Sequence, residues 1–371
     1  MSTKLILSAL LALTISGNSV AQILTTMHQG GSKKATVSEQ IGITDVTIHY
    51  DRPALKGREG KIWGQLVPYG FTDQGFGTSK AAPWRAGANE NTTFTFSTDV
   101  SIEGKPLAAG TYGFFIAVEN GEATLIFSSN STSWGSFFYD PKEDVLRVNV
   151  KTEPLDKPVE RLRYEFMDET DNSAVVALLW EKLKIPFKVE VDYVKTQLEL
   201  YRRELRSDKG FRWEAWVEAV NFCVQNNTNL NEALTWSDYA IGGVFVGQKN
   251  FSTLSAKASV LNKLGRKAEA DTLMKAAMPL ASMQELHGYG RQLLRDKRPA
   301  EALEAFKLNA QKNPNVFMTN MGLMRGYSAN GDFKNALKYA KAARLQVVDK
   351  ANRDALDSFI PMLEAGKDIN Q

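Results

Sequence analysis

The spacing of the apolar residues changes once along this chain, near residue 193. From residue 36 to residue 192 apolar side chains recur at every second position, which is typical of half-buried β-strands. From residue 193 onward they recur at helical spacing. The change predicts an all-β sandwich or jelly-roll domain over residues 22–192 and an all-α domain over residues 193–371. A length of 371 residues allows each domain its own core.

Four alanines mark a repeat in the helical part. Ala233, Ala270, Ala302 and Ala336 each follow a short turn, and their spacings are 37, 32 and 34 residues. The tetratricopeptide unit has a period of about 34 residues, and its two antiparallel helices approach closely where a small residue faces the partner helix. The spacing therefore predicts an array of tetratricopeptide-like helix pairs, with an irregular helical bundle as the alternative. Stacked repeats present extended surfaces, so we expect a protein partner there.

Within the β domain, Asn120 and Gly121 join two alternating runs and suit the tight turn of a β-hairpin. Residues 174–180 are nearly all apolar and predict a central strand. Residues 185–191 alternate with charged residues around Pro186 and predict an edge strand. Between residues 51 and 90 the alternation stops and seven glycines punctuate the chain. Loops of this length are usually functional or mobile.

The N-terminus has the pattern of a signal peptide over residues 1–21. Lys4 precedes an apolar run over residues 5–15, and the small residues Ser19 and Ala21 suit a cleavage site. The run is shorter than the roughly 20 residues that a membrane-spanning helix needs. We therefore expect a periplasmic or secreted protein with no transmembrane segment after cleavage. Cys223 is the only cysteine, so no intrachain disulfide is possible, and its setting predicts a buried thiol.

Composition and missing motifs exclude several function classes. The net charge of +3 is too balanced for a nucleic-acid-binding surface. The sequence has no Gly-x-Ser-x-Gly, Cys-x-x-Cys, His-Glu-x-x-His or Walker motif, so we expect no nicotinamide or nucleotide cofactor. His49 and Asp51 would share one face of a strand and could bind a metal ion, but exposed polar strand positions give the same pattern. We expect no metal.

Polar residues are densest in the glycine-rich stretch. The candidate ligand-binding residues are Arg52, Lys56, Arg58, Trp84, Arg85, Asn89 and Glu90. Arginine forks can clamp a carboxylate, a phosphate or a sugar, and Trp84 offers a stacking surface. The alternative is structural: Arg52 and Arg85 would pair with Asp51 and Glu90 and pin the loop to the sandwich.

The same stretch carries a family resemblance. Its motifs are Tyr50-Asp51-Arg52-Pro53, Lys56-Gly57-Arg58, Ile62-Trp63-Gly64, Val67-Pro68-Tyr69-Gly70, Trp84-Arg85-Ala86-Gly87-Ala88-Asn89-Glu90, Gly104-Lys105, Ala109-Gly110-Thr111-Tyr112 and Trp134-Gly135. In this order they resemble the domain of unknown function family numbered 2911, over about residues 40–191. The resemblance implies an exported bacterial protein, often with helical repeats after the β domain, and no known activity. In the family the Pro-Tyr-Gly and Trp-Arg elements are almost adjacent, whereas residues 71–83 separate them here.

Three functions remain open at this point. The leading one is a non-catalytic exported protein that binds a small polar or glycan-like ligand on the β domain and a partner protein through the repeats. The second is a hydrolase in which Glu90 is the general base and Arg52 or Arg85 stabilises negative charge. The third is a purely structural envelope protein whose arginines act as internal staples.

Overall fold

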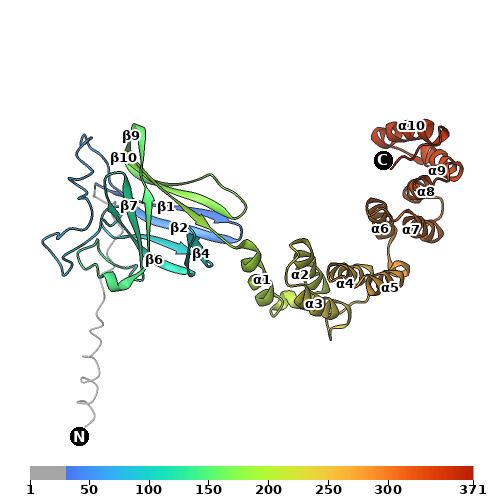
Figure 1. Ribbon diagram of the computed structural model, residues 1–371, viewed down its shortest axis with the longest axis horizontal. Helices are drawn as coiled ribbons and strands as arrows, with labels where there is room; N and C mark the ends of the chain where they lie inside the picture. Colours follow the sequence, from blue (N-terminus) through green and yellow to red (C-terminus); the bar gives the residue numbers. More distant parts are fainter. Residues whose placement is uncertain (1–30, 371) are drawn as a thin grey trace, which may run out of the picture. The chain divides into compact units, whose positions relative to one another are not determined.

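The computed structural model describes residues 31–370, so the predicted signal peptide lies outside the described residues. The described chain divides into two compact units between Thr196 and Gln197. The first contains strands and the second helices (Figure 1), which confirms the predicted all-β and all-α classes. No helix among the described residues is long and apolar enough to cross a bilayer.

The β domain consists of two antiparallel sheets. One has the strand order β1-β2-β3-β6-β7-β8 and the other β5-β4-β10-β9. The strands are β1 (Lys33–Ile41), β2 (Thr44–Arg52), β3 (Thr92–Phe96), β4 (Val100–Ile102), β5 (Lys105–Leu107), β6 (Gly110–Val118), β7 (Glu122–Ser128), β8 (Asp144–Lys151), β9 (Glu153–Met167) and β10 (Ser173–Glu190). Alternate residues of the strands fill one core, in which Phe94, Phe114, Phe127, Phe187 and Trp180 are almost completely buried. The predicted hairpin is present, because β6 and β7 pair across Asn120 and Gly121.

The predicted edge strand around Pro186 is wrong. Residues 174–180 and 185–191 belong largely to one long strand, β10, which lies between β4 and β9. Pairing with β9 ends at Lys184 and pairing with β4 begins at Val189. Pro186 falls between the two ladders, where the backbone N–H that proline lacks is not needed. A proline therefore fits an internal strand here.

The helical domain contains ten α-helices among the described residues. They are α1 (Tyr193–Glu204), α2 (Trp213–Gln225), α3 (Leu230–Gly242), α4 (Phe251–Lys263), α5 (Lys267–Ala277), α6 (Met283–Arg295), α7 (Pro299–Lys312), α8 (Phe317–Ala329), α9 (Phe333–Gln346) and α10 (Lys350–Glu364). The four repeat alanines lie on α3, α5, α7 and α9, and each is fully buried. They occupy the small-residue positions that the spacing predicts. Cys223 is also fully buried, and burial raises the pKa of its thiol to about 11.

Candidate functional site

The irregular segment between β2 and β3 is anchored to the sandwich. Leu55, Ile62 and Val67 are buried in the same core as the strands. The Leu55 N–H donates to the Glu160 carbonyl of β9 over 2.8 Å. Trp84 exchanges two backbone hydrogen bonds with Ile116 of β6, of 2.9 and 2.8 Å. The segment therefore holds a defined position against both sheets.

Lys56 and Arg58 hold the beginning of this segment. The Arg58 guanidinium donates to the carbonyls of Leu55 and Ala54 over 2.8 and 2.7 Å. The Lys56 backbone N–H donates to the Glu160 side chain over 3.3 Å. The hydrogen bonds of Arg58 therefore end on the backbone of its own loop, and Lys56 ties that loop to β9.

Trp84 belongs to a cluster of three tryptophans. It stacks on Trp180 at 6.0 Å between ring centroids and an angle of 19°, and it meets Trp63 edge-on at 5.7 Å. Its indole N–H donates to the Gly87 carbonyl over 3.1 Å. Because Trp180 lies on β10 in the core, the cluster connects both ends of the irregular segment to the sandwich.

Arg85 is enclosed by backbone and an aromatic ring. Its Nη1 donates to the Asn89 carbonyl over 3.0 Å, and its guanidinium carbon lies 5.1 Å from the centre of the Phe137 ring. Gly135 has a φ of +69°, which favours glycine, and a Cβ at this position would come within 2.7 Å of the guanidinium, so a larger residue would have to displace the Arg85 side chain. Burial lowers the pKa of Arg85.

Glu90 and Asp51 form a pair of carboxyl groups beside Lys34. Glu90 Oε1 lies 2.9 Å from Lys34 Nζ, and Lys34 stands directly opposite Asp51 in the register of β1 and β2. Asp51 is 4% exposed. Its pKa is raised by burial and by a hydrogen bond with Glu90, and the Asn89 side chain opposes the shift. The hydrogen bond from Lys34 lowers the pKa of Glu90.

The inner oxygens of this pair lack protein donors. Asp51 Oδ1 and Glu90 Oε2 are buried, and no donor among the described residues satisfies them. The two side chains hydrogen bond to each other, and because the pKa of Asp51 is raised and that of Glu90 is lowered, a proton shared by the pair lies on the Asp51 side. Glu90 therefore ionises before Asp51, and its carboxylate is balanced by the Lys34 ammonium.

A pocket of about 420 Å³ opens beside the pair, and we call it the acid-pair pocket. Its remaining polar side chains are mostly hydroxyls, with one amide and one imidazole. They are Thr36, His49, Asn91, Thr93, Ser131, Thr132 and Ser133. The His49 ring and the Thr36 hydroxyl hydrogen bond over 2.7 Å between Nδ1 and Oγ1. This lining can both donate to and accept from a polar, uncharged molecule.

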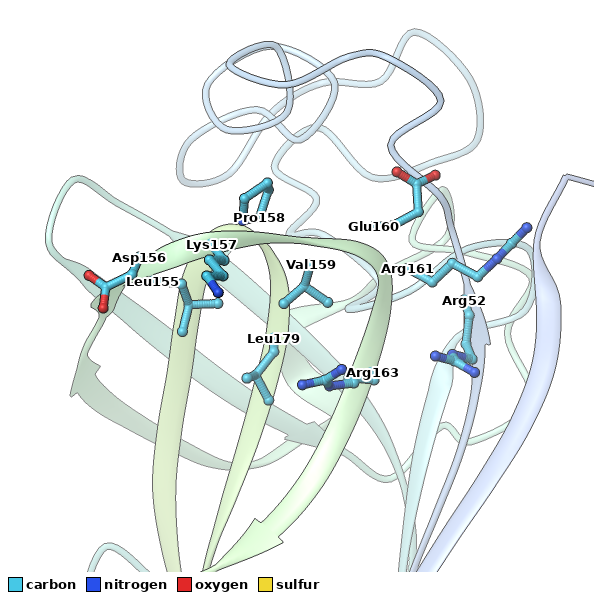
Figure 2. A pocket seen from close by; sticks show the side chains of 10 residues that line it. All are labelled: Arg52, Leu155, Asp156, Lys157, Pro158, Val159, Glu160, Arg161, Arg163 and Leu179. Atoms are coloured by element: carbon cyan, nitrogen blue, oxygen red, sulfur yellow. The ribbon is translucent and has the colours of Figure 1, made fainter.

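Arg52 lies elsewhere, in a groove on β9 and β10 that we call the arginine groove (Figure 2). Its Nε donates to the Leu162 carbonyl over 2.9 Å. The groove measures about 640 Å³ and is also lined by Arg161 and Arg163. Sequence analysis missed these two arginines. Their spacing of two residues on one strand is the signal that points to this surface, although only Arg163 extends over the groove floor and Arg161 extends away from it.

The structure thus separates the seven candidate residues into three groups. Asn89 and Glu90 meet Asp51 at the acid-pair pocket, and Arg52 lines the arginine groove. The other four make the internal contacts described above: Lys56, Arg58, Trp84 and Arg85. The cation beside Glu90 is Lys34, so the arrangement expected for a hydrolase with Arg52 or Arg85 at Glu90 does not form. No group of three or more His, Cys, Asp or Glu side chains in residues 31–370 is placed to hold a metal.

Comparison with known proteins agrees with the predicted resemblance. The family model described as "Protein of unknown function (DUF2911)" matches residues 32–189, which cover the β domain. A crystal structure of YrrB, described as a TPR protein with an unusual peptide-binding site, is similar at 20% sequence identity and a TM-score of 0.28. The likeness covers 41% of this chain and 76% of YrrB. No curated protein matches the sequence.

Proposed function

We propose that this is an exported, non-catalytic binding protein whose β domain takes a small hydroxyl-bearing ligand, such as a sugar, in the acid-pair pocket. The observation that carries the proposal is the Asp51–Glu90 pair at the pocket, in which the buried atoms Asp51 Oδ1 and Glu90 Oε2 have no partner in the described chain except each other's carboxyl group. Sugar hydroxyls donate well to carboxylates, and hydrogen bonds to charged groups are the stronger ones.

Export is supported by the pattern of residues 1–21, and recovery of the protein from the cytosol on fractionation would contradict it.

The ligand would replace the shared proton. With one proton between them, Asp51 and Glu90 satisfy each other in the free protein. A ligand with two hydroxyl groups can donate one hydrogen bond to each carboxylate. Both carboxyl groups can then ionise, because the ligand's hydrogen bonds replace the one that the proton formed. Binding therefore releases a proton, and affinity rises as the pH rises through the pKa of Asp51.

Saturation-transfer NMR with glucose, N-acetylglucosamine, glucosamine and glucuronate tests this site. We expect saturable binding of at least one neutral sugar. Asp51→Asn replaces an acceptor with an amide and should weaken that binding roughly ten- to hundredfold, since a hydrogen bond to a charged group contributes about 1.5–3 kcal/mol. Glu122→Gln, which changes an exposed carboxylate on β7, is the matched control and should bind as the wild type does.

Two outcomes would contradict the proposal: no binding of any of the four sugars, or equal binding by Asp51→Asn and the wild type.

The hydrolase alternative requires that a bound sugar glycoside be cleaved and that Glu90→Gln abolish the cleavage. Lys34 works against this role, because the lowered pKa of Glu90 makes it a weaker base. The side-chain contacts of Arg58, Trp84 and Arg85 support the structural interpretation for those three residues, and Lys56 contributes only its backbone N–H.

For the helical domain we propose binding of a peptide segment of a partner protein. One observation supports it, because α8 already holds a short segment of this chain. Ser328 donates to the Asp368 carboxylate over 2.7 Å, and its hydroxyl accepts from the Ile369 N–H over 3.0 Å. Asn370 donates to the Arg325 carbonyl over 3.0 Å, and Ile369 is buried. The segment combines a carboxylate, an apolar side chain and an amide.

A competition experiment tests the peptide function. A chain that ends at residue 366 should bind a fluorescent peptide of residues 367–371, measured by anisotropy, and the full chain should bind it more weakly because its own segment occupies the surface. Ser328→Ala in the shortened chain should reduce binding, while Ser358→Ala on the exposed face of α10 should not. A shortened chain that is folded by circular dichroism and does not bind the peptide would overturn the proposal.

A further inference from the structure

The arginine groove combines cations with an apolar floor. β9 arches over it, and the side chains of Leu155, Val159 and Leu179 face the space beneath (Figure 2). Arg163 is paired with Leu179 across the two strands and extends beside it. A volume of about 640 Å³ lies within the range of about 300–1,000 Å³ that is typical of small-molecule sites.

The cations of the groove retain hydrogen-bonding capacity. Arg52 donates one side-chain hydrogen bond, from Nε to the Leu162 carbonyl. Its two Nη atoms have no acceptor in residues 31–370. The Nζ atom of Lys157 has none there either. Arg163 forms one ion pair, with Glu165, in which both side chains are partly exposed. An exposed pair of this kind contributes little and can be exchanged for a ligand.

Neither of the two acidic side chains that line the groove, Asp156 and Glu160, forms an ion pair with its cations, and the one such pair in the described chain joins Arg163 to Glu165. Glu160 extends away from the groove and accepts a hydrogen bond from the Lys56 N–H. Arg161 also extends away, so the cations that remain over the apolar floor are Arg52, Lys157 and Arg163. A purely polar anion would leave that floor unused, and an uncharged apolar molecule would leave the guanidinium donors unpaired.

We propose that the arginine groove binds an anion that carries an aliphatic chain, such as a fatty carboxylate. The carboxylate accepts hydrogen bonds from Arg52 and Arg163, and the chain packs on Leu155, Val159 and Leu179. The cations Arg52, Lys157 and Arg163 form one small group that matches a single anionic head group, so we assign the groove one free amphiphile. A membrane surface is an alternative outcome of the test. This site is separate from the acid-pair pocket and does not depend on the function proposed for it.

Calorimetric titration of the full chain with laurate, below the concentration at which laurate forms micelles, tests the site. We expect saturable one-to-one binding. Acetate, which has the head group alone, and octanol, which has a chain without charge, should each bind roughly tenfold more weakly or worse. Arg163→Ala and Arg52→Ala should each weaken laurate binding by a similar factor. Lys182→Ala is the control, since it removes an exposed cation of β10 outside the groove, and it should leave laurate binding unchanged.

The comparison of laurate, acetate and octanol uses the wild-type protein, so it remains decisive if a variant fails to fold. Arg163→Gln serves as a second, milder variant, and circular dichroism checks each fold. The proposal is overturned if laurate does not saturate, if acetate or octanol binds as well as laurate, or if folded Arg163 variants keep full affinity. Binding to phosphatidylglycerol vesicles in place of laurate would also overturn it, in favour of a membrane-facing surface.

Discussion

Trp180→Ala is expected to lower the free energy of unfolding of the β domain by about 3–5 kcal/mol, the usual loss when a large buried aromatic is truncated. Trp180 is 1% exposed and contacts both Trp84 and Trp63. Its removal leaves a cavity and also takes away the surface on which the irregular segment between β2 and β3 rests. The effect should therefore extend beyond the core to residues 53–91.

Hydrogen exchange under increasing urea can measure this effect, because it reports on the β domain separately from the helices. Peptides from residues 53–91 should lose protection together with the strands. Trp134→Ala is the matched control. Trp134 is 59% exposed, and its truncation should change the free energy of unfolding of the β domain by less than about 0.5 kcal/mol. Equal effects of the two variants, or a Trp180 variant whose loop stays protected, would show that the tryptophan cluster does not anchor the segment.

Phe306→Ala should destabilise the helical domain by a similar amount, about 3–5 kcal/mol. Phe306 of α7 is 1% exposed and lies against three glycines of the neighbouring helices, Gly290, Gly322 and Gly326. A Cβ at Gly322 would come within 2.6 Å of the ring, so the glycines form a socket that only this ring fills.

Thermal unfolding followed by circular dichroism at a helical wavelength measures the loss. Leu345→Ala provides the control, since Leu345 is 90% exposed on α9 and its truncation should have almost no effect. Gly322→Val should destabilise as strongly as Phe306→Ala, through a clash instead of a cavity. If Phe306→Ala unfolds at the wild-type temperature, the repeats do not depend on this socket.

The sequence predicted those parts of the fold that depend on neighbours along the chain. The alanine spacing located the buried contacts of the helix pairs, because each pair is formed by adjacent helices. Asn120 and Gly121 located a hairpin for the same reason. Pro186 led to the wrong prediction of an edge strand, because whether a proline is tolerated depends on which strand lies beside it. The ladders of β10 with β9 and with β4 leave this position unpaired.

The site was harder to predict, because its members come from distant parts of the chain. Lys34 reaches Glu90 only through the register of β1 with β2. Arg52 lines the same groove as Arg163 because its side chain hydrogen bonds to Leu162 of β9, more than a hundred residues further along. The cluster of polar residues between positions 52 and 90 was visible in the sequence, but periodicity does not tell which side chains hold the loop and which face a pocket.

The binding proposed for the β domain depends on Asp51 holding a proton more tightly than Glu90 does, at the edge of a ligand pocket. Titration of the side-chain carboxyl carbons by NMR, without and with the sugar that binds, tests it most directly. The account predicts a pKa above the ordinary value for Asp51 and below it for Glu90, and a fall in the pKa of Asp51 when sugar is added. Two carboxyls that titrate at ordinary values, unaffected by sugar, would contradict it.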